Sequence, residues 1–320
     1  MVLSPSALKR FFIGKPIASS EDAHHRLSKK IALPVFASDA ISSTAYATEE
    51  ILIVFLSLAA VGLTAYENLV PISILVIILL IIVVSSYRQT IYAYPNGGGS
   101  YIVSRENLGR SPSLVAGASM LVDYILTVAV SVSAGVAAIV SAFGNLAPYR
   151  VEICVAFIFL ITLANLRGLK ESGALFAPPT YLYIISLASL IIVGLYKVYF
   201  KDLGPIDHSD EYAKELLSGQ KTLTLFFFLK AFSSGAVALT GIEAVADGVP
   251  AFEKPEPKNA SKTLLWMAVI LGTSFLGLSV LAQKLEPIKD HEGNIKITVL
   301  AQMAEQVYGG RNIFFYITQF

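Results

Sequence analysis

The sequence has few charged residues, a single cysteine and almost equal numbers of basic and acidic residues. Only 15% of its 320 residues are charged, whereas a soluble globular protein carries about 25%. The single cysteine, Cys154, excludes a disulfide within the chain. A net charge of +1 leaves no basic surface for a nucleic acid. The scarcity of charge therefore excludes an ordinary soluble protein, and no nucleic-acid partner is expected.

Long apolar blocks replace the missing charges. Hydrophobic residues make up 55% of the chain, and they gather in runs of about the 20 residues that a helix needs to cross a bilayer. The polar start of the chain contains no apolar stretch of a cleavable signal peptide. We predict an all-α polytopic membrane protein with seven spans and the start of an eighth near Ile313, as in the N-terminal part of a longer protein. The seven predicted spans are 31–60, 69–87, 113–143, 153–166, 175–199, 223–252 and 263–282.

Lysine and arginine are shared unevenly between the two sides of the predicted membrane. Segment 1–30 and the connections after the second, fourth and sixth spans carry more of them than the other connections. Because basic loops stay on the cytoplasmic side, we predict a cytoplasmic N-terminus and an extracellular connection 200–222. The connections around 200–221 and 284–312 mix charges of both signs, and we expect them to be solvated.

Three carboxylates, those of Asp39, Asp123 and Glu243, fall well inside predicted spans. An ionisable group at the centre of a spanning helix costs roughly 2.5 to 3.5 kcal/mol on insertion scales. One such group alone is equally well explained as a structural contact between helices. Three together, accompanied by hydroxyl groups, favour a shared polar site that faces protein, water or an ion.

Two of the predicted spans are poor continuous helices. The first contains SDAISST, where serine, aspartate and threonine side chains compete for backbone hydrogen bonds. The sixth contains AFSSGAVALTGIE, in which Gly235 and Gly241 weaken the helix. Two helices broken at mid-membrane, five spans apart, are typical of inverted-repeat transporters, whose breaks form the substrate site.

The polar side chains of these spans form stripes of oxygen atoms. On the third span the spacing of four places Asp123, Thr127 and Ser131 on one face. Carboxylate, hydroxyl and phenol oxygens suit an alkali cation or a proton rather than zinc or copper. All four histidines lie in predicted connections, so we expect no histidine metal site in the membrane. The candidate ligands are Asp39, Tyr46, Asp123, Tyr124, Thr127, Ser131, Thr240 and Glu243.

Three stretches resemble the Kup-type potassium uptake transporters, and more narrowly the bacterial branch that imports potassium with a proton. They are SSDAISSTAY-like residues in the first span, YPNGGGSYIVSRENLG leading into LVDYILTVAVSVSAG, and LKAFSSGAVALTGIEAV. These transporters belong to the amino acid–polyamine–organocation superfamily. The resemblance implies a LeuT-like fold of two inverted five-helix repeats, here 31–199 and an incomplete 223–320. It also implies a homodimer in the bacterial inner membrane, with a cytosolic C-terminal domain.

The same resemblance implies that potassium passes along all eight candidate ligands. In the expected mechanism, potassium sheds water onto the oxygen atoms of Asp39, Tyr46, Asp123, Thr127 and Thr240. Asp39 or Glu243 then carries the co-transported proton, because a buried carboxylate favours its neutral form while a bound cation favours the charged form. No cofactor other than the transported potassium ion and proton is expected, and no enzymatic activity.

Other interpretations of the same residues stay open. An amino acid permease of the same superfamily is the nearest alternative, although Asp39 in the first break would repel a substrate carboxylate. An intramembrane aspartyl protease would use Asp39 and Asp123 as a dyad, but its usual flanking residues are absent. A sensor would bind potassium without transporting it. The NGGGS turn at 96–100 favours a flexible lead into the third span over a phosphate site, because no Gly-Lys-Ser/Thr follows.

Overall fold

A computed structural model describes residues 26–56, 64–166, 168–207, 224–288 and 297–319. Within these residues the named elements are helices, and a single backbone bridge pairs Leu27 with Phe252. Six segments of the described chain are long and apolar enough to cross a membrane. These are Tyr66–Ala93, Arg110–Ala142, Gly144–Asn165, Lys170–Phe200, Leu225–Asp247 and Glu256–Leu285. They coincide with the second to seventh predicted spans, whereas the first, 31–60, is not among the six and stays a prediction.

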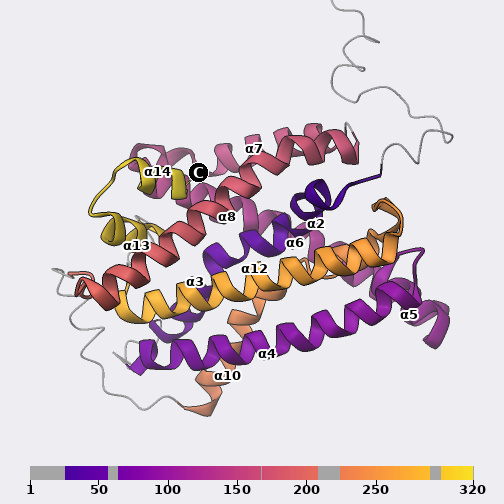
Figure 1. Cartoon of the computed structure of the whole chain (residues 1–320), viewed down its shortest axis with the longest axis horizontal. Helices are drawn as coiled ribbons and strands as arrows, with labels where there is room; N and C mark the ends of the chain where they lie inside the picture. Colours follow the sequence, from indigo (N-terminus) through magenta and orange to yellow (C-terminus); the bar gives the residue numbers. More distant parts are fainter. Residues whose placement is uncertain (1–25, 57–63, 167, 208–223, 289–296, 320) are drawn as a thin grey trace, which may run out of the picture.

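The helices of the described chain pack side by side. The elements in chain order are α2 (Lys29–Ser42), α3 (Thr44–Leu56), α4 (Thr64–Ala93), α5 (Gly99–Leu108), α6 (Arg110–Ala142), η2 (Gly144–Tyr149), α7 (Arg150–Asn165), α8 (Leu169–Phe200), α10 (Leu225–Gly235), η3 (Ala236–Leu239), α11 (Ala244–Asp247), η4 (Val249–Ala251), α12 (Glu256–Leu285), α13 (Val299–Tyr308) and α14 (Ile313–Gln319). Helix α12 packs along α4, α2 packs along α8, and α10 packs against α3 (Figure 1).

In the predicted first span the helix is interrupted at a single residue, Ser43, between α2 and α3, and the Ser43 backbone keeps helical angles (φ −62°, ψ −21°). Three consecutive hydroxyl groups each donate to the carbonyl three residues earlier: Ser42 to Asp39 at 2.8 Å, Ser43 to Ala40 at 2.7 Å and Thr44 to Ile41 at 2.6 Å. Such side-chain bonds compete with the helical ladder and bend it. The hydroxyl run of the sequence therefore coincides with the interruption between α2 and α3.

The predicted break in the sixth span is also present, and it is the longer one. Helix α10 ends at Gly235, the 3-10 helix η3 follows, and a turn over residues 240–243 leads into the short helix α11. Gly241 sits in this turn with φ +82°, a left-handed conformation that costs other residues about 1–2 kcal/mol. A glycine at this position therefore permits the turn that follows η3.

The expectation of a solvated connection over 284–312 is wrong for its second half. Residues Val299–Tyr308 form α13, whose inward face, including Leu300, Met303 and Val307, is buried. Charged side chains hold both ends: the Glu49 carboxylate accepts from the Val299 backbone N–H at 3.1 Å, and Lys197 Nζ donates to the Val307 carbonyl at 2.7 Å. An anion at the N-terminus and a cation at the C-terminus both complement the helix dipole.

Candidate functional site

The two helix breaks meet in the interior. The Ser43 hydroxyl, whose single hydrogen is shared between two carbonyl oxygens, lies 2.7 Å from the Ala40 carbonyl and 3.2 Å from the carbonyl of Ala238 in η3. The carboxylate of Asp39 lies directly against Gly241, where an added Cβ would come within 2.5 Å of Asp39 Oδ2. From the facing helix α6, Ser131 donates to Asp39 Oδ1 at 3.5 Å. Asp39 therefore occupies the space at which α2, α6 and the turn of the sixth span converge.

Most of the predicted ligands gather around this point, although to different degrees. Tyr46 is 6% exposed and Thr127 is 8% exposed, so both are buried. Asp39, Tyr124, Ser131, Thr240 and Glu243 are half-buried. Asp123 is exposed on α6, yet its charge acts on both Asp39 and Glu243. The structure thus brings three carboxylates within electrostatic reach of one another, with Asp123 at the margin.

Tyr124 belongs to a second polar cluster, displaced from Asp39. Its hydroxyl donates to Asp247 Oδ2 at 2.5 Å, which joins α6 to α11. Tyr87 on α4 lies within electrostatic reach of both Asp247 and Glu243. Asp247 was not among the predicted site residues, although it follows Glu243 by four positions, the spacing that places two side chains on one face of a helix.

The glycine residues of the NGGGS turn pack against Asp247. Gly97 and Gly99 both have left-handed φ angles, and an added Cβ on Gly99 would come within 2.0 Å of Asp247 Oδ1. Gly98 N–H donates to the Asp247 backbone carbonyl at 3.3 Å. The turn is therefore a specific packing surface between α4 and α5, rather than a flexible lead into the third span. Because an acidic side chain occupies it, it does not favour a phosphate.

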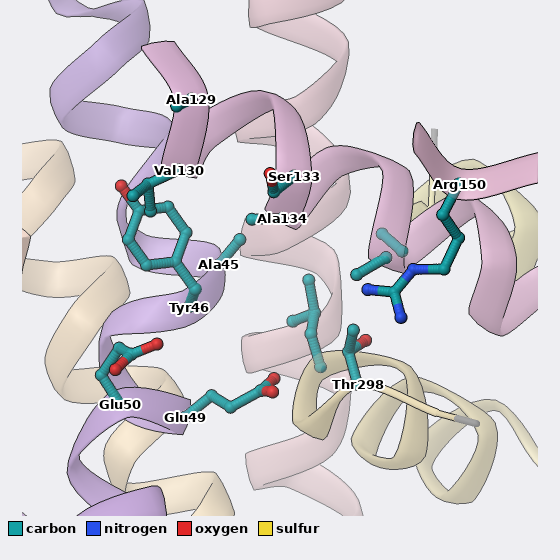
Figure 2. Close-up of a pocket in the computed structure, with 13 residues that line it drawn as sticks. Ala45, Tyr46, Glu49, Glu50, Ala129, Val130, Ser133, Ala134, Arg150 and Thr298 are labelled. Atoms are coloured by element: carbon teal, nitrogen blue, oxygen red, sulfur yellow. The ribbon is translucent and has the colours of Figure 1, made fainter. Parts of the chain in front are cut away.

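A cavity of about 340 Å³ is lined by residues of α3, α6, α7 and α13, Tyr46 among them. Helix α3 contributes Tyr46, Glu49 and Glu50, and Arg150 and Thr298 face them from the other side (Figure 2). Glu49 points toward Thr298 in this view, in keeping with its bond to the first turn of α13. The cavity is thus lined both by the buried candidate ligand Tyr46 and by the charged residues Glu49, Glu50 and Arg150.

These residues can coordinate a cation through oxygen atoms and hold or pass a proton between carboxylates. Within the described ranges there is no group of three or more histidine, cysteine, aspartate or glutamate side chains placed to share a metal ion. The donors that do gather near Asp39 are hydroxyl, phenol and carboxylate oxygens, the ligand types that suit alkali metal ions and protons.

Replacing Tyr124 with phenylalanine should lower the thermal stability of the protein. The change removes a donor from a partly buried carboxylate, and a hydrogen bond to a charged group contributes about 1.5–3 kcal/mol. A loss of that size lowers the melting temperature by several degrees in a domain of this size. Thermal unfolding in detergent measures it. Tyr92→Phe, on the exposed face of α4, is the matched control, and an equal melting temperature for both variants would contradict the role of the Tyr124–Asp247 bond.

The sequence is similar to a known protein family and to a curated relative. Residues 33–320 match the family described as amino acid permease. A curated relative, described as potassium transporter KimA of Bacillus subtilis (strain 168), is 47% identical over 315 residues. The alignment covers 98% of this chain and 50% of the relative. The chain therefore spans about half the length of the relative that it matches.

Proposed function

Because the chain belongs to the amino acid permease family, we propose that it forms part of a secondary active transporter that imports potassium ions together with protons. The observation that carries the proposal is the position of Asp39, whose carboxylate lies where the two helix breaks meet. The relative named as a potassium transporter supports the same cargo, and so does the resemblance to the Kup-type branch.

Potassium would exchange its water for the oxygens of Asp39, Tyr46, Thr127 and Ser131, which come from three helices. A carboxylate at this point compensates for the dehydration of the cation. Asp39 or Glu243 would carry the proton, because a cation bound nearby favours the charged form of a carboxylate and thereby links the two ligands. Two positive charges that move inward through 100 mV supply about 4.6 kcal/mol, enough for about a thousand-fold extra accumulation.

The remaining features of the proposal concern architecture and location. The breaks in the first and sixth spans support two inverted five-helix repeats, of which 31–199 is the first and 223–320 the start of the second. Alternating access would come from one bundle rocking against the other. We place the protein in the bacterial inner membrane as a homodimer, with its N-terminus in the cytoplasm, so that Glu49 and Glu50 face the outside.

Amino acid transport is the second candidate, favoured by the family to which the chain belongs. An amino acid would bring its carboxylate to the helix breaks, where Asp39 already lies against Gly241, Asp123 lies within electrostatic reach of Asp39, and both of these carboxylates lie within reach of Glu243. Like charges at this separation disfavour an anionic group. The geometry therefore supports a cation over an amino acid.

Uptake into proteoliposomes tests the proposal. The protein should accumulate rubidium or potassium when a proton gradient is imposed, and a protonophore should abolish the accumulation. Sodium and a mixture of labelled amino acids serve as competing substrates in parallel vesicles. Uptake of amino acids that is indifferent to potassium would overturn the proposal, and potassium binding without flux would reassign the protein as a sensor.

A further inference from the structure

A groove of about 480 Å³ lies between α4 and α12, two helices that pack side by side (Figure 1). Its lining residues recur at spacings of three and four over residues 77–88 of α4 and 265–276 of α12, so each set lies on one face of its helix. Ile81, Leu265 and Val269 are exposed. The groove is therefore open to the surroundings of the protein, and its volume lies in the range of about 300–1,000 Å³ that is typical of ligand sites.

The groove is apolar along most of its length and charged at one end. Among the described residues that line it, Arg88 is the one that carries a charge. Ser85 and Thr273 also line the groove, but their hydroxyl groups donate to carbonyls of their own helices, at 2.6 Å each. The remaining lining side chains are apolar or glycine. A ligand that fits this lining has a long apolar part and an anionic group at one end.

A hydrogen bond holds the guanidinium group of Arg88 at this end. Arg88 Nε donates to Ser261 Oγ of α12 at 3.1 Å. An arginine has five N–H donors, so this bond uses one of them, and the two terminal nitrogen atoms can bind phosphate oxygens in bidentate fashion. Lys262 is exposed and precedes Leu265 by three positions, which places it on the face of α12 that lines the groove. Two cationic side chains at one end favour an anionic headgroup.

The depth of Arg88 in the bilayer fits a phospholipid headgroup. Trp266, the single tryptophan of the chain, is exposed on α12, and Tyr92 is exposed one turn beyond Arg88 on α4. Tryptophan and tyrosine are enriched where spanning helices cross the headgroup level. From Arg88 back to Ile77, α4 rises about 16 Å at about 1.5 Å per residue, which is about half of the roughly 30 Å hydrocarbon core. The apolar part of the groove therefore matches the depth of one leaflet.

We infer that the groove between α4 and α12 binds a phospholipid with an anionic headgroup, whose phosphate pairs with Arg88 and whose acyl chain lies along the apolar faces of both helices. Free phosphate would leave the apolar length of the groove without a ligand, whereas a phospholipid fills both parts. The bound lipid contacts both helices and should stabilise their packing. Since α12 also packs on α2, and α4 on α10, this stabilisation extends to both interrupted spans and should appear in the melting temperature.

Thermal unfolding of the full chain in detergent tests the inference, with titrations of phosphatidylglycerol, of phosphatidylcholine with the same acyl chains, and of inorganic phosphate. Phosphatidylglycerol should raise the melting temperature at lower concentrations than phosphatidylcholine, and inorganic phosphate should leave it unchanged. Arg88→Gln should raise the apparent dissociation constant of phosphatidylglycerol about tenfold, the loss of one charge-assisted contact, and should remove the preference between the two lipids. Arg105→Gln is the matched control, because Arg105 is exposed on α5 and also donates to a hydroxyl group, that of Tyr101, at 3.4 Å.

Val269→Phe tests the apolar part of the groove separately. The larger side chain occupies space that the acyl chain needs, so both lipids should lose affinity to the same extent. We expect a loss of about tenfold, which corresponds to about two methylene groups displaced from the groove. Val155→Phe, on an exposed position of α7, is the matched control and should bind both lipids as the parent does.

Three results would overturn the inference. The first is an equal constant for phosphatidylglycerol in the Arg88→Gln and Arg105→Gln proteins, or in the Val269→Phe and Val155→Phe proteins. The second is a parent protein that inorganic phosphate stabilises as well as lipid does, which would make the groove end a free-phosphate site. The third is a Val269→Phe protein that changes its oligomeric state in light scattering and keeps its lipid affinity, which would assign the groove to a contact between copies of the chain.

Discussion

Replacing Asp39 with asparagine should lower proton-driven rubidium uptake by at least about a hundredfold. The carboxylate is half-buried, lies against the turn at Gly241 and accepts from Ser131. Asparagine has nearly the same shape but no charge, so the variant keeps the packing and loses the electrostatic attraction for the cation. Loss of one charged partner in a desolvated site costs about 3 kcal/mol, which corresponds to a factor of roughly a hundred.

Initial rates of uptake into proteoliposomes measure this effect, with the melting temperature of each variant as a check on folding. Glu67→Gln is the matched control, because Glu67 is an exposed carboxylate in the first turn of α4. The control should transport at the rate of the parent. An Asp39→Asn protein that folds and transports rubidium at half the parental rate or faster would remove Asp39 from the ion path.

The helix breaks illustrate what the sequence makes predictable. In the first span the interruption at Ser43 coincides with the hydroxyl groups of residues 42–44, which donate to carbonyls three residues back. In the sixth span, glycine identifies the region of the break, and Gly241 is one of its turn residues. Such features depend on neighbours in the chain, and a single sequence therefore reveals them.

Features that depend on distant contacts were not predictable in the same way. Helix α13 is ten residues long and follows a charged stretch, so its pattern is too short to stand out from a loop. Only the tertiary structure brings Glu49 and Lys197 to its two ends. Likewise, the contact between the glycine turn and Asp247 joins two segments that lie about 150 residues apart in the sequence.

In the candidate site, too, local spacing was predictable from the sequence and long-range contacts were not. The spacing of four on α6 correctly relates Thr127 to Ser131 as residues of one face, but it could not indicate that Asp123, one turn earlier, is exposed. Nor could spacing indicate that Tyr124 pairs with Asp247.

Replacing Gly241 with alanine should impair transport more than it impairs folding. The residue has φ +82°, and a left-handed conformation costs an alanine about 1–2 kcal/mol. The added Cβ would also come within 2.5 Å of Asp39 Oδ2 and 3.0 Å of its Cγ. Since the side chain of Asp39 can turn away more easily than the backbone can move, the expected result is a displaced carboxylate at the meeting point of the breaks.

We expect Gly241→Ala to lower rubidium uptake by tenfold or more, since 1.4 kcal/mol lost from the competent arrangement corresponds to a factor of about ten. The melting temperature should fall by only a few degrees. Gly144→Ala is the matched control, because a Cβ there would meet nothing within 4 Å. If Gly241→Ala transports normally, the carboxylate of Asp39 does not need its observed position against the turn, and the ion path must avoid the junction of the two breaks. If uptake falls while Gly144→Ala is unaffected, the left-handed turn is required because it leaves room for the acidic side chain that the cation meets.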